Sequence, residues 1–202
     1  MVSQQDTRLP DKLCGPRVVV RPYRATDAEA MYAAVDESRE VLLPWFAWVE
    51  RYRSIADARA YCERMAVAWS ACEALSCGVF DTTGVYLGST GLMRPDWAAR
   101  TFELGYWIRR SEGGRGYVSE AVQVMTRLAF EGLAARRVEI RCDSRNDRSR
   151  RVAERLGFVF EGRLRNDSLD PVGVARDMLV FSLIPGDYAR LRDVWWDNPT
   201  PD

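Results

Sequence analysis

The chain has 202 residues, of which 47% are hydrophobic and 29% are charged, and this size and composition predict one well-buried core rather than two. Its 29 basic and 29 acidic residues cancel, which disfavours general binding to nucleic acid or to a membrane surface. Histidine is absent, which excludes Ser-His-Asp and Cys-His catalysis and disfavours a catalytic zinc site, so no metal is expected.

Neither a membrane segment nor a disulfide framework is expected. No run reaches the apolar length of a membrane span, and residues 1–13 lack the hydrophobic centre of a signal peptide. The five cysteines are odd in number and lack Cys-x-x-Cys pairing, which is typical of reduced thiols. These features predict a soluble, cytoplasmic protein.

The first half of the chain predicts a strand, two helices and a hairpin. Residues 1–16 read as a loose arm, and Arg17–Tyr23 as the first strand. Thr26 with Glu29, and Ser54 with Asp57, each have the spacing of a capping box that opens a helix. Three antiparallel strands are expected next, at Leu75–Asp81, Val85–Met93 and Phe102–Ile108.

The second half alternates helices with strands. A helix is expected from Tyr117 to Leu133, a strand at Val138–Asp143, a short helix at Asn146–Leu156, a strand after the Gly157-Phe158 turn, and a last strand at Val174–Leu183. Residues 185–202 read as a polar tail in which two tryptophans cover the core. This order predicts a mixed α/β sheet within one domain over residues 1–202.

A glycine-rich loop joins the strand at Phe102–Ile108 to the helix that begins near Tyr117. Its glycines are Gly113, Gly114 and Gly116. The first N–H groups of a helix lack intrahelical partners, and glycine lets a phosphate approach them, so the order strand, loop, helix predicts an anion site. The alternative is a plain turn. The sequence excludes two common phosphate-binding motifs. The motif G-x-x-x-x-G-K-[ST] needs a lysine after the loop, but the only lysine is Lys12, and the glycines do not have the spacing G-x-G-x-x-G.

Three segments of the chain, ELGYWI, GRGYVSEA and NDRSRRVAERLGFVFEG, come in one order between Arg17 and Leu183. Together they resemble the GNAT acetyltransferases, and more narrowly the branch that acetylates the N-termini of ribosomal proteins. The resemblance implies an α/β (α+β) fold, with a mixed, mostly antiparallel central sheet, splayed parallel strands and helices on both faces. The loop departs from the family pattern at Gly113 and at Val118, where a β-branched side chain could crowd a pyrophosphate.

The same resemblance implies acetyl-CoA as co-substrate, without a metal. It assigns the binding of coenzyme A to Trp107, Ile108, Arg109, Gly114, Arg115, Gly116, Tyr117, Val118, Ser119, Asn146 and Ser149. Asn146 would bond the pantetheine arm, and Ser149 would face the sulfur and ease departure of the thiolate. The structural alternative makes Asn146 a helix N-cap and Ser149 an ordinary first-turn residue.

The group that accepts the amine proton stays open at this stage. Related enzymes carry a glutamate in the hairpin after the Gly-Phe turn, where this chain has Asn166-Asp167-Ser168. Asp167 and Glu103 are therefore both candidates, although each could be an ordinary surface carboxylate. An α-amine, whose pKa is about 8, would need only a weak base or water, whereas a lysine at about 10.4 would need more.

The acceptor pocket is expected among tryptophans and a phenylalanine. Trp45, Phe46 and Trp48 surround Pro44 in a segment that covers the substrate side in the family, although they could instead form a hydrophobic plug between two helices. Trp97 is either a pocket residue or a lid over the core.

The sequence therefore predicts an N-acetyltransferase that moves an acetyl group directly to a primary amine, with a ribosomal or other protein N-terminus as the leading acceptor. Two rivals remain: a small-molecule amine acetyltransferase of the same fold, and a non-catalytic module that binds acyl-CoA. The expected partners are acyl-CoA and the amine acceptor, with no nucleic acid and no membrane. The chain is expected to be a monomer or a homodimer.

Overall fold

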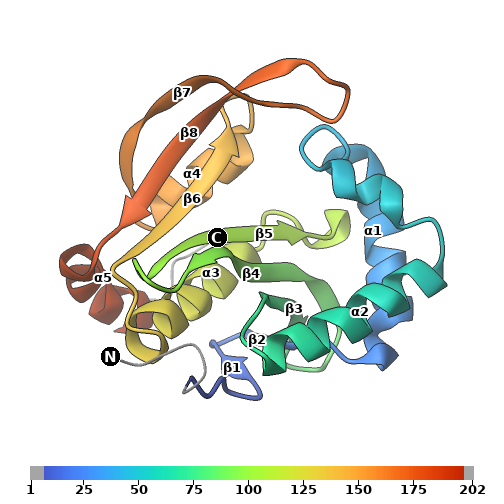
Figure 1. Ribbon diagram of the computed structural model, residues 1–202. Coiled ribbons are helices and arrows are strands. Elements are labelled where there is room, and N and C mark those ends of the chain that lie inside the picture. Colours follow the sequence, from blue (N-terminus) through green and yellow to red (C-terminus); the bar gives the residue numbers. More distant parts are fainter. Residues whose placement is uncertain (1–6, 198–202) are drawn as a thin grey trace.

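The computed structural model describes residues 7–197, which are built around an eight-stranded sheet of order β1-β2-β3-β4-β5-β6-β8-β7 (Figure 1). The strands are β1 (Leu13–Cys14), β2 (Val18–Pro22), β3 (Leu75–Asp81), β4 (Tyr86–Asp96), β5 (Thr101–Ile108), β6 (Arg137–Asp143), β7 (Val159–Leu169) and β8 (Ala175–Leu183). The helices are α1 (Ala28–Leu42), α2 (Ile55–Ser70), α3 (Tyr117–Arg127), α4 (Asp147–Arg155) and α5 (Pro185–Asp197). Short helical turns are η2 (Ala25–Asp27), η3 (Ala47–Arg51), η4 (Arg110–Glu112) and the π-helical η5 (Leu128–Gly132).

The strands β5 and β6 are parallel and separate soon after they meet, as Figure 1 shows. Their pairing covers Thr101–Glu103 opposite Arg137–Glu139, whereas β4 stays paired with β5 as far as Ile108. The remaining neighbours in the described sheet are antiparallel. The expected fold, a mostly antiparallel sheet with splayed parallel strands, is confirmed. The edge of β5 beyond Glu103 is left without a strand partner on the β6 side.

Side chains that alternate along the strands build one core on each face of the sheet. On β5, Phe102 and Leu104 belong to the larger core, which α3 and α5 cover, whereas Trp107 points to the opposite face. There Trp107 joins Tyr86 of β4 and residues of α1 and α2. Helices therefore lie on both faces, and the open edge of β5 runs between the two cores.

The predicted helix starts have different outcomes. Ser54 caps α2 as expected, since its hydroxyl accepts a hydrogen bond from the amide of Asp57 at 3.3 Å. The pairing of Thr26 with Glu29 is wrong. Asp27 takes the capping role instead, because its carboxylate accepts from the amide of Arg24 at 2.7 Å and pairs with Arg21 at 2.7 Å. The long helix from Tyr117 also changes character after Arg127, where the π-helical turn η5 begins.

Both ends of the described chain contain regular structure, where the sequence predicted a loose arm and a polar tail. Leu13–Cys14 form β1 and pair with Val19 and Val20 of β2, so the stretch predicted as a loose arm contains a strand. Residues 185–197 form the helix α5, in which Trp195 is buried against the larger core. Residues 1–6 and 198–202, which the two predictions also covered, lie outside the described residues. Within residues 7–197, no helix is both long and apolar enough to cross a membrane.

Candidate active site

The splay between β5 and β6 opens a cavity of about 310 Å³. It brings together residues that are far apart in the sequence. Glu103 comes from β5, Asn146 and Ser149 from the start of α4, and Asp167 from β7. These are the four polar residues that the sequence singled out for acyl transfer outside the glycine loop. We call this space the splay cavity.

Ser149 is held by a tyrosine on the facing strand. Its hydroxyl oxygen lies 3.0 Å from the hydroxyl of Tyr106, which also donates to the Ser149 carbonyl at 3.2 Å. When Tyr106 donates to either oxygen of Ser149, the proton of Ser149 remains free to be donated, and the Cys142 thiol is one neighbour within its reach. Burial raises the pKa of Tyr106 far above its ordinary value, so this hydroxyl stays protonated at physiological pH.

Asn146 is the N-cap of α4. Its side-chain oxygen accepts a hydrogen bond from the Ser149 amide at 3.1 Å, which is the structural role that the sequence left as an alternative. The amide nitrogen of the Asn146 side chain is not consumed by this cap, and the residue lines the splay cavity. Capping and a contact with a bound ligand are therefore compatible.

Glu103 is the more buried of the two candidate carboxylates. Its side chain is 13% exposed and lies 3.3 Å from the guanidinium of Arg94, which is mostly exposed. Burial raises the pKa of Glu103, with Arg94 and Arg141 opposing that rise. A carboxylate with a raised pKa accepts a proton more readily than an ordinary one, which suits a general base.

Asp167 lines the same cavity, but its carboxylate is bound by an arginine. Its carboxylate accepts a hydrogen bond from the guanidinium of Arg141 at 2.7 Å. It lies on a stretch of β7 where the pairing with β8 shifts register, next to Asn166 with φ +50°. Because this carboxylate is already engaged by a guanidinium at hydrogen-bond distance, Asp167 is the weaker candidate for the base.

The glycine loop follows β5 and ends in the N-terminus of α3. Gly116 is the N-cap with φ +77°, and Gly114 has φ +84°, a conformation that favours glycine. Gly116 offers no side-chain oxygen, so the first N–H groups of α3 receive no side-chain cap. Because β5 and β6 are parallel, this loop and the β6–α4 junction with Asn146 lie at the same edge of the sheet.

Gly113 and Val118, the two residues at which the loop departs from the family pattern, have different surroundings in the structure. Gly113 has φ −67°, and a Cβ there would meet only the carbonyl of Arg110, at 3.4 Å, so other residues fit this position. Val118 is partly buried and packs against the larger core. Its β-branched side chain therefore contributes to the anchoring of α3 under the sheet.

The residues after the open edge of β5 are fixed by α1. The Arg109 guanidinium pairs with Glu37, whose other oxygen accepts from the amide of Ser111 at 2.7 Å. Hydrogen bonds from Arg109 lower the pKa of Glu37 to about 2. The Arg109 side chain is thus occupied, and its backbone N–H donates to the carbonyl of Leu87 at 2.8 Å. The contact of coenzyme A with Trp107, Ile108 and Arg109 stays a prediction.

A second cavity of about 760 Å³ lies between α2 and the sheet, and we call it the acceptor cavity. Phe46, Trp48, Gly105 and Tyr106 line both cavities, so the two spaces adjoin. Trp45 lines the splay cavity alone. The three expected aromatic residues of this segment are therefore walls of cavities and not only a plug between helices.

Trp97 lies elsewhere, contrary to its expected pocket role. It sits in the β4–β5 connection and packs edge-on against Phe102, with ring centroids 5.6 Å apart. It lines neither cavity, and it is partly buried against the larger core. This is the alternative that the sequence offered, a lid over the core.

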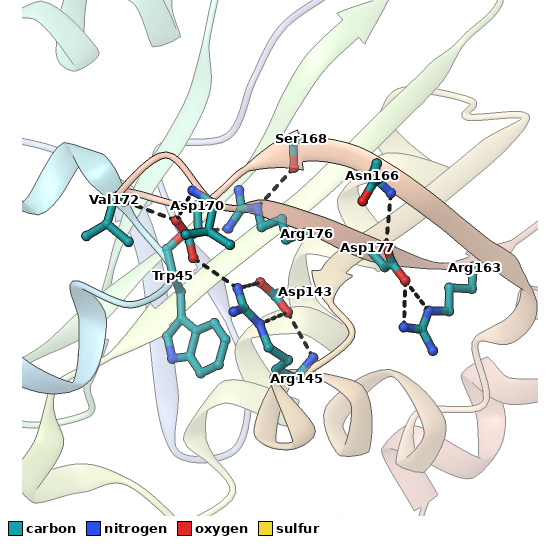
Figure 2. Close-up of polar contacts among 11 residues, drawn as sticks. Trp45, Asp143, Arg145, Arg163, Asn166, Ser168, Asp170, Val172, Arg176 and Asp177 are labelled. Carbon is teal, nitrogen blue, oxygen red and sulfur yellow. Dashed lines mark hydrogen bonds and ion pairs between the residues drawn. The ribbon is translucent and has the colours of Figure 1, made fainter.

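The hairpin of β7 and β8 closes the splay cavity from above. In Figure 2, Arg145 joins Asp143, at 2.7 Å, to Asp170 near the tip of the hairpin, at 3.3 Å. Arg176 of β8 donates to the Ser168 hydroxyl at 2.9 Å and to the carbonyl of Trp45 at 3.2 Å. The hairpin is thereby connected both to the start of α4 and to the aromatic wall. Sequence patterns gave no signal for Arg176, because its partner is 131 residues away.

The geometry fits coenzyme A on three counts. The free edge of β5 can pair with an extended amide-containing arm, the uncapped N-terminus of α3 can hold a phosphate, and Ser149 lines the splay cavity beside β5. Within residues 7–197, no group of three or more histidine, cysteine or carboxylate side chains is arranged to hold a metal ion.

Comparison with known proteins identifies the family. Residues 17–159 match the acetyltransferase (GNAT) domain family. The chain is 30% identical over 176 residues to YdaF of Bacillus subtilis, provisionally named a ribosomal N-acetyltransferase, with 85% of this chain and 93% of YdaF covered. It is 36% identical over 80 residues to the ribosomal-protein-serine acetyltransferase of Escherichia coli, covering 37% of this chain and 45% of that protein.

The fold is also similar to that of a solved structure. The structure of RimL, a ribosomal L7/L12 α-N-protein acetyltransferase in complex with coenzyme A, superimposes with a TM-score of 0.78 at 20% identity, covering 86% of this chain and 97% of RimL. The splayed parallel strands, the glycine loop and the family match agree, and the chain belongs to the GNAT acetyltransferases.

Proposed function

We propose that this acetyltransferase transfers the acetyl group of acetyl-CoA directly to the α-amine of a protein or peptide N-terminus. The observation that carries the proposal is the junction of the two cavities beside Ser149, because Tyr106 lines both and contacts Ser149. The names of the two bacterial sequence relatives support a ribosomal protein as the acceptor. The volume of the acceptor cavity, about 760 Å³, supports an acceptor larger than a simple amine.

Different residues of the chain would bind acetyl-CoA, assist departure of the thiol and hold the amine. Bound acetyl-CoA would supply an activated thioester. The N–H groups at the start of α3, beside Gly114 to Ser119, would hold its pyrophosphate, and the backbone of Trp107 to Arg109 would pair with its extended arm. Ser149 would donate a hydrogen bond to the departing sulfur, with Tyr106 orienting the hydroxyl. Trp45, Phe46 and Trp48 would flank the incoming amine.

Direct transfer is favoured over an acyl-cysteine intermediate. Cys142 is the cysteine that lines the splay cavity, and burial raises the pKa of its thiol to about 11, with a hydrogen bond to Ser149 opposing the rise. The nucleophilic form of cysteine is the thiolate. At neutral pH only about one Cys142 side chain in ten thousand would be ionised at that pKa.

Glu103 is the proposed proton acceptor, and its replacement makes a two-sided prediction. Glu103→Gln is expected to lower kcat/KM at pH 7.5 about tenfold, a modest loss because roughly a quarter of an α-amine is already neutral there. The same change is expected to raise the Tm. Because the folded-state pKa of Glu103 is raised, its ionised form costs folding stability above that pKa. The gain should therefore be present at pH 8 and disappear near pH 4.

Asp167→Asn is the matched control, since it removes a carboxylate from the same cavity. Loss of activity in Asp167→Asn alone, with Glu103→Gln active, would transfer the role to Asp167. Thermal unfolding over the same pH series separates this result from a folding defect.

The acceptor assignment is tested with a peptide that carries both a free N-terminus and an internal lysine. Mass spectrometry of the product is expected to show acetylation at the N-terminus, with lysine much slower, because at pH 7.5 only about one lysine in a thousand is neutral. Predominant lysine modification would contradict the proposal. Turnover of free amino compounds without peptide turnover would favour a small-molecule acceptor instead.

A further inference from the structure

The acceptor cavity carries two positive charges that the transfer step does not use. Arg51, at the end of η3, and Arg64, on α2, both line it. Among residues 7–197, neither guanidinium forms an ion pair with a carboxylate. The carboxylate that shares this cavity is Asp57, which is occupied as part of the α2 cap by Ser54 at 2.8 Å and the amide of Arg53 at 3.1 Å.

One of these arginines lies over an aromatic ring. The guanidinium of Arg64 lies over the ring of Tyr61, 5.5 Å from its centroid. Tyr61 is in turn held by the Ser76 hydroxyl at 3.0 Å and by the ring of Tyr52, whose centroid is 5.7 Å away. A guanidinium stacked on a ring keeps its in-plane N–H donors free, so it can still bind a carboxylate or a phosphate.

The arginines and the reaction centre occupy different walls of the cavity. Arg64 is on α2, whereas Tyr106, which contacts Ser149, is on β5. An acceptor that occupies this cavity and places its amine beside Tyr106 and Ser149 would therefore share the cavity with both arginines. We infer that Arg51 and Arg64 form a subsite for an anionic group of the acceptor, and that the preferred acceptor is a peptide with acidic side chains just after its N-terminal residue. This inference rests on the proposed function and deepens it.

The test compares amidated hexapeptides with Asp or Asn at positions two and three, using acetyl-CoA and a readout of free thiol. For the natural chain, the Asp peptide is expected to have a kcat/KM about tenfold higher, since partly exposed ion pairs are individually weak. The ratio should fall to about one in Arg51→Gln/Arg64→Gln. It should persist in Arg59→Gln, because Arg59 is an exposed arginine of α2 that lies outside the cavity.

Equal turnover of the two peptides by the natural chain, or a preference that survives in the double variant, would overturn the subsite. A phosphoserine peptide distinguishes phosphate from carboxylate recognition. If no peptide is acetylated, the proposed acceptor class fails by itself, and the subsite is then read from a free amino acid that is turned over, with its carboxyl group either free or amidated. Faster turnover of the free carboxylate supports the subsite, and equal turnover overturns it.

Discussion

Ser149→Ala is expected to lower kcat by roughly a hundredfold and to leave the KM for acetyl-CoA nearly unchanged. In the proposed mechanism this hydroxyl donates to the departing sulfur, so its loss should act on the chemical step. The fold should tolerate the change, because Tyr106 keeps its hydrogen bond to the Ser149 carbonyl at 3.2 Å and Asn146 still caps the helix. Steady-state kinetics with both substrates varied measures the effect.

Ser144→Ala is the control for this experiment. Ser144 lies between β6 and α4 and lines neither cavity, so its hydroxyl should be dispensable. If Ser149→Ala raised the KM for acetyl-CoA with kcat unchanged, Ser149 would be a positioning residue and not a proton donor.

Gly116→Val is expected to weaken coenzyme A binding by about a hundredfold or more. Gly116 has φ +77°, a conformation that strains a β-branched residue. In the proposed binding mode, a side chain at this N-cap would crowd the pyrophosphate at the first turn of α3. Losing two charge-assisted N–H contacts would account for an effect of this size. Isothermal titration calorimetry with coenzyme A gives the measurement.

The strain itself is controlled with Gly84→Val. Gly84 has φ +94° in the β3–β4 turn, and a Cβ there would meet nothing within 4 Å. Both variants should lose a similar amount of stability, but only Gly116→Val should lose affinity for coenzyme A. Unchanged affinity in a folded Gly116→Val would contradict the pyrophosphate assignment.

The sequence predicted features that depend on neighbouring residues better than those set by distant ones. The cap formed by Ser54 and Asp57 is local and was found. The Thr26 cap was wrong because the helical turn already begins at Ala25, so Thr26 lies inside it. Asp27 closes the turn by accepting from the amide of Arg24 and pairing with Arg21. The strand at Leu13–Cys14 has only two residues and exists through its pairing with β2, so no periodicity could reveal it.

The site was predicted to a similar extent and for similar reasons. Ser149, Asn146, Glu103 and Asp167 were chosen from motifs, and the structure places all four on one cavity. The hydrogen bonds that position these four side chains could not be predicted from the sequence. The hydrogen bond between Tyr106 and Ser149 was not predicted, because the two residues are 43 positions apart in the sequence. Exposed arginines on a helix, such as Arg64, look like a solvated face until the opposite wall of the cavity is known.

The short parallel pairing of β5 with β6 has a consequence for how the molecule holds together. Only three residue pairs join these strands, whereas β6 is paired along its length with β8, and β5 with β4. The sheet therefore consists of two halves, β1 to β5 and β6 to β8, each well paired internally. They meet along a short seam, which is the pairing of β5 with β6. A co-substrate that lies along the open edge of β5 would complete this seam, so the two halves should move more independently once the thiol product has left.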